Sequence, residues 1–249
     1  MELKRFFVDK NSLIGDIITL TDVEHNHLSN VLRLKVGDFA VVVMGDGYDY
    51  KCEITEINKK CSTLKVVDKQ VNIYDPKVNV TVFQCIIKGD NMPLVVQKLN
   101  ELGVATLVPV TSKFTVALGS KNLVTKLQAT ANQSVKQCKR SKPIKIEDIL
   151  TLKQIVNSFK DFDLVILANE REDATTMQVA ISNANKPQNV AVIIGSEGGF
   201  DLDEIEFLVS NGAKSITMGH RILRAETASI ALTSALMCLL GEWELWKRY

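Results

Sequence analysis

The last third of the chain carries two glycine-containing loops, each placed between an apolar run and a predicted helix. Residues 195–199 (Gly-Ser-Glu-Gly-Gly) follow the apolar run 190–194, and residues 219–226 follow the run 215–218. Open α/β sheets bind their ligands in loops at the carboxyl ends of parallel strands. We therefore expect the two loops to form two walls of one pocket.

From residue 77 onward, apolar runs of strand length alternate with segments of helical spacing. This alternation predicts an α/β fold, in which a largely parallel sheet is covered by helices on both faces. The predicted strands cover residues 78–87, 104–110, 164–168, 190–194 and 215–218, and the predicted helices cover residues 91–102, 120–138, 174–184, 201–211 and 227–240.

The beginning of the chain has a different pattern, which is mostly that of β-strands. An apolar run at residues 39–44, a loosely alternating segment at 48–57 and a further segment at 64–71, separated by turn signals, predict a small barrel. One helix is expected to interrupt the barrel, with Asp22 as its N-cap. Five residues fall at helical spacing: Val23, His27, Leu28, Val31 and Leu32.

The length of 249 residues suits one large domain or two modest ones. The change of pattern occurs at Asp75-Pro76, which is short, polar and contains the turn signal of a residue before proline. We therefore expect two domains, at residues 1–73 and 77–249.

Composition excludes several classes of protein. The five cysteines are odd in number and show no Cys-x-x-Cys spacing, so neither a disulfide framework nor a zinc site is expected. The net charge of +1 points to no partner, and an RNA partner would need local clusters of positive charge. The first residues lack a signal-peptide pattern and no apolar run could span a membrane, which favours a cytoplasmic protein.

The last predicted helix, residues 227–240, is almost wholly apolar. A helix that is apolar on every side is buried on every side. In a domain of this size a second subunit is the simplest cover, so a homodimer is expected. The alternative is a central helix in a monomer.

The first glycine loop lacks both the Gly-x-Gly-x-x-Gly and the P-loop fingerprints. A phosphate site at a helix N-terminus also disfavours nearby carboxylates, whereas Glu197 lies in this loop and Asp201, Asp203 and Glu204 follow it. Such a site favours a neutral or cationic ligand, for example an adenosine that carries a sulfonium. A plain strand-to-helix turn with acidic capping is the alternative.

The second loop places Arg221, Arg224 and Glu226 immediately before an apolar helix. Charge at this position favours a functional role. An ion pair between Arg224 and Glu226 that only ties the loop down is the alternative.

Five motifs together resemble those of one known family. They are residues 194–200, 218–228, 98–104, 5–7 and 27–38, so the resemblance runs nearly end to end. The chain is similar to the RsmE family, the bacterial 16S ribosomal RNA uridine-N3 methyltransferases of the SPOUT class.

The resemblance implies a PUA-like β-barrel that binds RNA, followed by an α/β knotted SPOUT methyltransferase domain whose C-terminus forms a trefoil knot. It also implies S-adenosyl-L-methionine as cofactor, S-adenosyl-L-homocysteine as product and a homodimer. Three positions depart from the family pattern. Ser196 replaces a proline, which leaves the loop less rigid, and Ala225 replaces a threonine. Lys136 replaces an acidic residue, so no acid can act there.

Carried over by position, the cofactor pocket would lie at the ends of three strands. Most contacts would be backbone hydrogen bonds to adenine and ribose, with apolar walls from Leu167, Ile222 and Leu223. The implied cofactor residues are Leu167, Asn169, Glu170, Gly195, Ser196, Glu197, Gly198, Gly199, Met218, Gly219, Ile222, Leu223, Arg224 and Thr227.

The implied reaction is in-line transfer of a methyl group to N3 of a uridine in 16S ribosomal RNA, for which alignment supplies much of the rate. Because N3 carries a proton, a cation near the uracil oxygens would favour the anion that attacks. Arg224 is the first candidate for that cation. Glu226 is expected to orient Arg224 or to act as base, and Glu197 is the second candidate for the base.

RNA contact is expected from a basic stretch at residues 136–145, which contains no acid, and from smaller clusters. A solvated helix face is the alternative for this stretch. No metal site is expected. The implied RNA-binding residues are Arg5, Arg33, Lys35, Lys136, Lys139, Arg140 and Lys142.

Three rival functions stay open. The first is a knotted methyltransferase that acts on another RNA position, such as a tRNA ribose. The second is a non-catalytic RNA-binding module whose α/β domain only dimerises. The third, a nucleotide-dependent α/β enzyme, is disfavoured by the missing phosphate fingerprints and the acidic loop.

Overall fold

The structure is a computed structural model that describes residues 3–116 and 122–244. The chain divides into two compact units. The first consists of Met1–Asp75 with Asn132–Pro143, and the second of Pro76–Ala131 with the remainder of the chain. The first unit therefore includes a segment that we expected in the second domain.

Asp75 is the physical reason for this division. Its carboxylate accepts hydrogen bonds from the backbone N–H groups of Ser141 and Lys142 and from the Ser141 hydroxyl. It also pairs with the guanidinium of Arg140, which is almost fully buried. The last residue before the boundary thus holds the returning segment 132–143 in the first unit.

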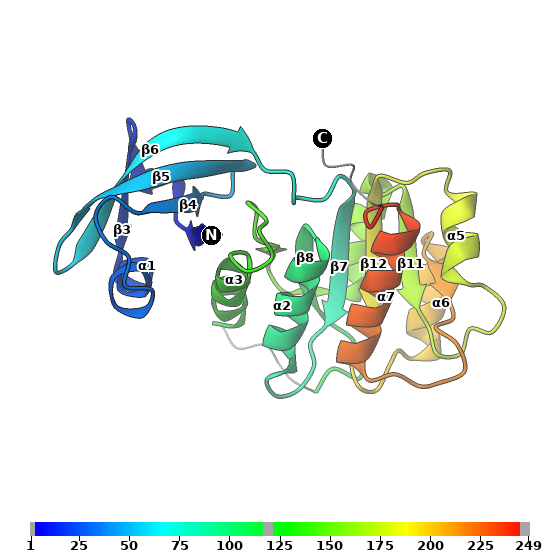
Figure 1. Cartoon of the computed structure of the whole chain (residues 1–249). Coiled ribbons are helices and arrows are strands. Elements are labelled where there is room, and N and C mark those ends of the chain that lie inside the picture. The colour runs from blue at the N-terminus through cyan, green and yellow to red at the C-terminus, as the bar shows by residue number, and fades with distance from the viewer. Residues whose placement is uncertain (1–2, 117–121, 245–249) are drawn as a thin grey trace. The chain divides into compact units, whose positions relative to one another are not determined.

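The first unit is built on a six-stranded sheet with the order β1-β4-β5-β6-β3-β2 (Figure 1). Along β5 the side chains of Tyr50, Cys52 and Ile54 alternate into the core, as expected for a sheet with one buried face. The strands are β1 (Lys4–Phe7), β2 (Leu13–Ile14), β3 (Ile17–Thr21), β4 (Phe39–Val43), β5 (Tyr48–Ile57) and β6 (Cys61–Val71).

The helix of the first unit differs from the prediction. It consists of α1 (Asp22–Asn26) and a π-helical turn, η2 (His27–Val31). The prediction of Asp22 as N-cap is wrong, because the N-cap is Thr21. Leu28 is buried, but Val23 and Val31 are 65% and 63% exposed. The wide turn, with a bond from Leu32 N–H to the carbonyl of His27, rotates the side chains away from the spacing of a regular α-helix.

The second unit contains the predicted parallel sheet, with the order β10-β8-β7-β12-β11-β13 and β9 beside β8. Every pair in it is parallel. The two-residue strands β9 and β10 were not predicted, because so short a segment shows no periodicity. The strands are β7 (Asn79–Cys85), β8 (Thr106–Thr111), β9 (Lys145–Ile146), β10 (Leu150–Thr151), β11 (Leu164–Ala168), β12 (Asn189–Ile194) and β13 (Lys214–Ile216).

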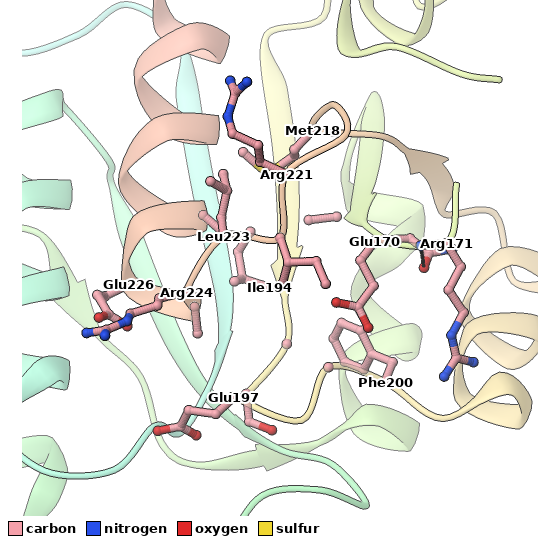
Figure 2. Close-up of a pocket in the computed structure, with 18 of the residues that line it drawn as sticks. Glu170, Arg171, Ile194, Glu197, Phe200, Met218, Arg221, Leu223, Arg224 and Glu226 are labelled. Carbon is pink, nitrogen blue, oxygen red and sulfur yellow. Dashed lines mark hydrogen bonds between the residues drawn. The ribbon is translucent and has the colours of Figure 1, made fainter. Parts of the chain in front are cut away.

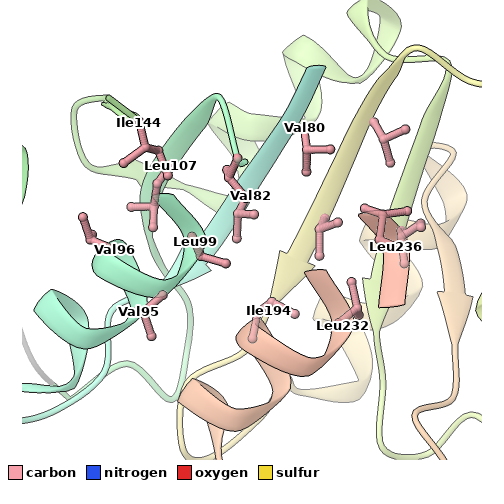
Figure 3. Close-up of a cluster of buried hydrophobic side chains, with 14 of the residues drawn as sticks. Val80, Val82, Val95, Val96, Leu99, Leu107, Ile144, Ile194, Leu232 and Leu236 are labelled. Atoms are coloured by element: carbon pink, nitrogen blue, oxygen red, sulfur yellow. The ribbon is translucent and has the colours of Figure 1, made fainter. Parts of the chain in front are cut away.

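Helices cover both faces of this sheet, and a separate apolar cluster lies beneath each set. Val80 and Val82 of β7 belong to the cluster under α2, α3, α5 and α7 (Figure 3), whereas Phe83 and Cys85 belong to the cluster under α4 and α6. The helices are α2 (Asn91–Leu102), α3 (Leu123–Ser134), α4 (Leu152–Ile155), α5 (Met177–Asn183), α6 (Leu202–Ser210) and α7 (Ala225–Leu239), with 3-10 turns η1 (Lys10–Ser12) and η3 (Val156–Asp161).

Helix α3 is shorter than predicted. The prediction covered residues 120–138, of which 120 and 121 lie outside the described residues. The helix ends at Ser134, and Lys139 adopts a left-handed backbone conformation with φ of 65°. Residues 135–139 form turns, and the left-handed backbone of Lys139 does not allow the helix to continue beyond them.

The C-terminal segment returns from the edge of the sheet toward its centre. After the edge strand β13, the N–H of Thr217 donates to the carbonyl of Thr175, so the chain runs beside the segment that links β11 to α5. Helix α7 then packs on α2 and β12, on the other side of β11. This crossing is the one that the expected C-terminal trefoil knot requires.

Helix α7 is buried on one face only within this chain. Ser229, Leu232 and Leu236 face the sheet, whereas the opposite face exposes Ala231 and Leu239. The exposed face is nonetheless apolar, so it lacks the polar residues of an ordinary solvated helix surface. In the described ranges, no helix is long and apolar enough to cross a membrane.

Asp163 fastens the beginning of β11 to the beginning of β12. Its carboxylate accepts the backbone N–H groups of Asn189 and Gln188, each at 2.8 Å. These bonds hold the pKa of the Asp163 carboxyl below its usual value. A lowered carboxyl pKa in the folded state stabilises the fold above the ordinary pKa, and this contribution is lost as the pH falls through the lowered value.

Replacement of Asp163 by alanine is therefore expected to make the free energy of unfolding depend less steeply on pH in the acid range. Wild type should lose stability more steeply than Asp163→Ala below about pH 5, in urea unfolding measured at a series of pH values. If both proteins lost the same free energy of unfolding as the pH fell, Asp163 would not be the source of this pH dependence.

Candidate functional site

A pocket of about 510 Å³ opens at the carboxyl ends of β11, β12 and β13 (Figure 2). The segments that follow these three strands form its walls, together with the first turn of α7. The residues that line it are Asn91, Ala168, Asn169, Glu170, Arg171, Ile194, Gly195, Ser196, Glu197, Gly199, Phe200, Met218, Gly219, Arg221, Ile222, Leu223, Arg224, Ala225, Glu226 and Ala228.

The first glycine loop is a tight turn at the end of β12. The N–H of Gly199 donates to the carbonyl of Ser196 at 2.9 Å, and Gly199 has a φ of 64°, which favours glycine. A Cβ atom on Gly195 would lie 3.1 Å from the Gly199 Cα and 3.2 Å from the Phe200 ring. A side chain at Gly195 would therefore push against the other end of the turn.

Gly198 points away from the pocket. A Cβ atom there would lie 2.8 Å from the Cβ of Phe114, in the segment after β8. The Ser196 hydroxyl also bonds the Phe114 carbonyl at 3.2 Å. This segment thus supports the back of the loop, and Ser196 supplies an anchor that a proline at this position could not make.

Substitution of Gly195 tests the role of this close approach. Gly195→Ala is expected to weaken binding of S-adenosylmethionine by at least about 10-fold, because the loop must open to admit the methyl group. Isothermal titration calorimetry would measure the dissociation constant. Gly15→Ala is the control, because Gly15 has a positive φ that disfavours alanine, but no atom lies within 4 Å of its Cβ position. It should cost about 1 kcal/mol of stability and leave the affinity unchanged.

The acidic residues around the first loop fall into two groups. Asp201 and Glu204 form the capping box of α6 and contact Lys113, whose Nζ lies 2.5 Å from Asp201. This pair lowers the pKa of Asp201. Glu197 and Glu170, by contrast, line the pocket, and one Glu197 oxygen accepts the backbone N–H of Lys88 at 2.7 Å.

The second loop delivers an arginine and a glutamate to the start of α7. Arg224 is the N-cap residue, and Glu226 lies in the first turn. In Figure 2, both side chains extend to the same side of the pocket as Glu197, whereas Arg221 extends away. Within the described part of the chain, neither the Arg224 guanidinium nor the Glu226 carboxylate has an ion-pair partner. The alternative of an Arg224–Glu226 tie is therefore not what the structure shows.

The structure brings most of the implied cofactor residues to one pocket, with three exceptions. Leu167 is fully buried in the apolar cluster under α4 and α6, and its neighbour Ala168 lines the pocket instead. Gly198 faces Phe114, and Thr227 is exposed on α7 away from the lining. Those that line it are Asn169, Glu170, Gly195, Ser196, Glu197, Gly199, Met218, Gly219, Ile222, Leu223 and Arg224.

Sequence reasoning missed several residues of the pocket. Asn91, at the start of α2, reaches it because β7 lies beside β12, and a single sequence does not show that order. Arg171 and Phe200 could have been found from their positions directly beside predicted loops.

The pocket fits S-adenosylmethionine. Its volume lies within the range of about 300–1,000 Å³ for small-molecule sites. Ile194, Met218 and Leu223 offer an apolar wall suited to adenine, and the glycines let backbone groups approach the ligand. The carboxylates of Glu170 and Glu197 suit ribose hydroxyls and a positively charged sulfonium.

Among residues 3–116 and 122–244 there is no group of three or more metal-ligating acidic, histidine or cysteine side chains. His25 bonds the Ser62 hydroxyl through Nδ1 at 2.8 Å. The His27 ring packs edge-on against Phe6. His25 is buried and His27 is half-buried in the first unit.

The cationic residues expected to bind RNA divide into two sets. Carboxylates engage three of them: Arg5 makes a bidentate contact with Asp49, Lys136 pairs with Glu24 at 2.7 Å, and Arg140 pairs with Asp75. Of the other four, three are exposed, and Lys139 is half-buried beside an aromatic ring. Arg33, Lys35 and Lys142 are exposed, and Lys139 Nζ lies 5.5 Å from the centre of the Tyr74 ring.

Two family models match the chain. An RNA methyltransferase domain matches residues 75–237, and an RNA methyltransferase PUA domain matches residues 14–67. Relatives named ribosomal RNA small subunit methyltransferase E include those of Mesomycoplasma hyopneumoniae, 30% identical over 92% of this chain and 96% of that protein, and Rickettsia conorii, 29% identical over 92% and 93%.

Two solved structures show the same fold over nearly the whole chain. A methyltransferase of Legionella pneumophila, solved with its cofactor SAM, has a TM-score of 0.85 at 26% identity and covers 96% of this chain and 98% of that one. A ribosomal RNA small subunit methyltransferase E from Neisseria gonorrhoeae, bound to S-adenosyl methionine, has a TM-score of 0.86 at 24% identity, with the same coverage.

Proposed function

We propose the activity of this chain from one premise: it belongs to the ribosomal RNA small subunit methyltransferase E family. The expected fold class, a knotted SPOUT domain preceded by a PUA-like barrel, is confirmed. The chain uses S-adenosylmethionine to methylate N3 of a specific uridine in the 16S RNA of the small ribosomal subunit. The observation that carries this proposal is the pocket, because the two glycine loops and Arg224 meet there.

S-adenosylmethionine supplies an electrophilic methyl group on its sulfonium when it is bound. The protein's contribution is to bind, to align and to stabilise charge. Glu170 and Glu197 favour a cation in the pocket, and the Lys88 N–H fixes the position of Glu197. The apolar wall around Ile194 and Leu223 excludes water from one side.

Arg224 is proposed to stabilise the uridine as it loses its N3 proton. Its guanidinium is exposed at the pocket and has no carboxylate partner among the residues described, so its charge is available to the uracil oxygens. Glu226 is proposed to orient Arg224 or to accept the proton, because both residues line the pocket at the start of α7. Glu197 stays the second candidate for the base, since its other oxygen accepts no bond that the structure records.

For RNA contact we propose the exposed residues Arg33, Lys35 and Lys142. Arg5, Lys136 and Arg140 are engaged by carboxylates of their own unit, which makes them structural cations. Exposed lysines attract phosphate regardless of sequence, and nearby tyrosine rings such as Tyr74 offer a surface on which unpaired bases can stack.

A homodimer is proposed from the exposed apolar face of α7, which carries Ala231, Ala235 and Leu239. A second copy would complete the burial that the sequence of this helix calls for. We also propose a cytoplasmic location, since the small ribosomal subunit is the substrate.

The test is methyl transfer from labelled S-adenosylmethionine to small subunits that lack the native N3-methyluridine. Naked 16S RNA and tRNA run alongside, and mass spectrometry of nucleosides identifies the product. N3-methyluridine from ribosomal RNA alone is the expected result. A methylated tRNA ribose would identify tRNA as the substrate in place of ribosomal RNA. Cofactor binding without methyl transfer to any of these RNAs would contradict the ribosomal assignment. Absence of both cofactor binding and methyl transfer would favour a non-catalytic RNA-binding module.

A further inference from the structure

We propose that Gln84 and Ser229 are positioning residues that fix the first glycine loop in its cofactor-binding conformation. This inference rests on the proposed function, because it assigns their effect to cofactor affinity. Gln84 belongs to β7 and Ser229 to α7, so the pair connects α7 to the loop at the end of β12.

Both side chains are polar and fully buried. The Ser229 hydroxyl donates to Gln84 Oε1. Gln84 Nε2 donates to its neighbour's carbonyl, that of Cys85, at 2.9 Å and to the carbonyl of Gly195 at 3.4 Å. A buried amide is costly unless it is bonded, so this placement demands partners.

The amide orientation follows from its partners. The carbonyl oxygens of Cys85 and Gly195 can only accept, so the Gln84 nitrogen must face them. The Gln84 oxygen then faces Ser229, whose hydroxyl can donate. The three bonds form one connected chain from α7 to the loop.

Gly195 is the residue at which this series of hydrogen bonds reaches the pocket. A trans peptide is planar, so a fixed Gly195 carbonyl fixes the plane of the whole unit that joins it to Ser196. Glycines elsewhere in the loop leave its backbone few steric limits of its own. Ser196 is held from the Phe114 side, and Gln84 supplies the hold on the β7 side.

Thr233 gives an internal comparison on the same helix. It lies four residues after Ser229 on the same buried face, and it too is fully buried. Its hydroxyl has no hydrogen-bond partner among the residues that the structure describes. Apolar side chains surround this face, including Leu232, Leu236 and Ile194 in Figure 3. Burial on this face therefore does not by itself give a hydroxyl a hydrogen-bond partner, so the Ser229–Gln84 hydrogen bond is specific to that position.

The experiment measures the dissociation constant of S-adenosylmethionine by calorimetry, with the free energy of unfolding measured beside it. Ser229→Ala is expected to weaken binding by about 3- to 10-fold, the effect of one hydrogen bond. Gln84→Leu removes the whole chain of bonds and should weaken binding by at least about 10-fold. Ser229→Thr keeps the hydroxyl and should retain wild-type affinity. Thr233→Val is the matched control and should also bind like wild type.

A merely structural role would lower stability without this pattern in the affinity. Wild-type affinity in both Ser229→Ala and Gln84→Leu would overturn the proposal, as would an equal loss in Thr233→Val. If Gln84→Leu does not fold, the comparison of Ser229→Ala with Ser229→Thr decides. At saturating cofactor, kcat should change by less than about 3-fold, whereas KM for the cofactor should rise.

The proposed function can fail separately. A wild-type protein that binds the cofactor but methylates no ribosomal RNA would refute the ribosomal assignment and leave the positioning proposal to be decided by the affinities. A wild-type protein that binds no S-adenosylmethionine would overturn both.

Discussion

Arg224→Ala is expected to lower kcat for RNA methylation by about 100- to 1,000-fold, the effect of removing one preorganised charge-stabilising group. The reason is the N3 proton of uridine. Without the guanidinium, the anion that attacks the methyl group loses the cation that we assign to its stabilisation. Single-turnover methyl transfer at saturating cofactor and RNA would measure the effect, and the affinity for cofactor should change by less than about 3-fold.

Arg221→Ala is the matched control, because Arg221 belongs to the same loop and is also exposed, yet its side chain extends away from Glu226 and Glu197 in Figure 2. It should keep kcat within about 3-fold of wild type. Raising the pH should partly restore the Arg224→Ala variant, since a larger fraction of uridine is then ionised. Full turnover in Arg224→Ala at neutral pH would show that another group stabilises the anion.

Asp75→Ala is expected to destabilise the first unit by about 3–5 kcal/mol, the usual cost of removing one partner of a buried ion pair. The Arg140 side chain is only 4% exposed, and burial already lowers its pKa. The variant would leave this charge without its carboxylate, and Ser141 would lose its acceptor.

Denaturant unfolding, followed by a probe in the first unit, would measure this loss. Asp16→Ala is the control, because Asp16 pairs with Lys65 at 3.8 Å while both side chains are more than half exposed. An exposed pair contributes at most about 1 kcal/mol. If Asp75→Ala and Asp16→Ala lost equal free energy of unfolding, the buried ion pair of Asp75 would stabilise the protein no more than the exposed pair of Asp16.

The sequence predicted the sheet of the second unit and the two loops of the pocket, because apolar runs and glycines mark strand ends locally. It did not predict the partners that reach the pocket from elsewhere. Gln84 and Lys88 contact the first loop from 111 and 109 positions away. Those contacts depend on β7 lying beside β12, and strand order is a property of the whole sheet that no local pattern encodes.

The errors in the first unit have a similar origin. The burial of Arg140 depends on Asp75, so the basic stretch that was expected to contact RNA contains a buried cation. The exposed Val23 and Val31 follow from a π-helical turn, and spacing rules assume a regular α-helix. In both cases the deciding interaction is one that periodicity does not report.

The discontinuous first unit has a consequence for biosynthesis. Asp75 is translated 68 residues before Pro143, which ends the segment that this carboxylate holds. At about 5–20 residues per second, the nascent sheet waits roughly 3 to 14 s for Arg140 and its neighbours to emerge. During that interval Asp75 lacks its partners, so the N-terminal sheet cannot complete its folding as an independent first step on the ribosome. Stable closure of the first unit must await synthesis of α3 and the turn beyond it.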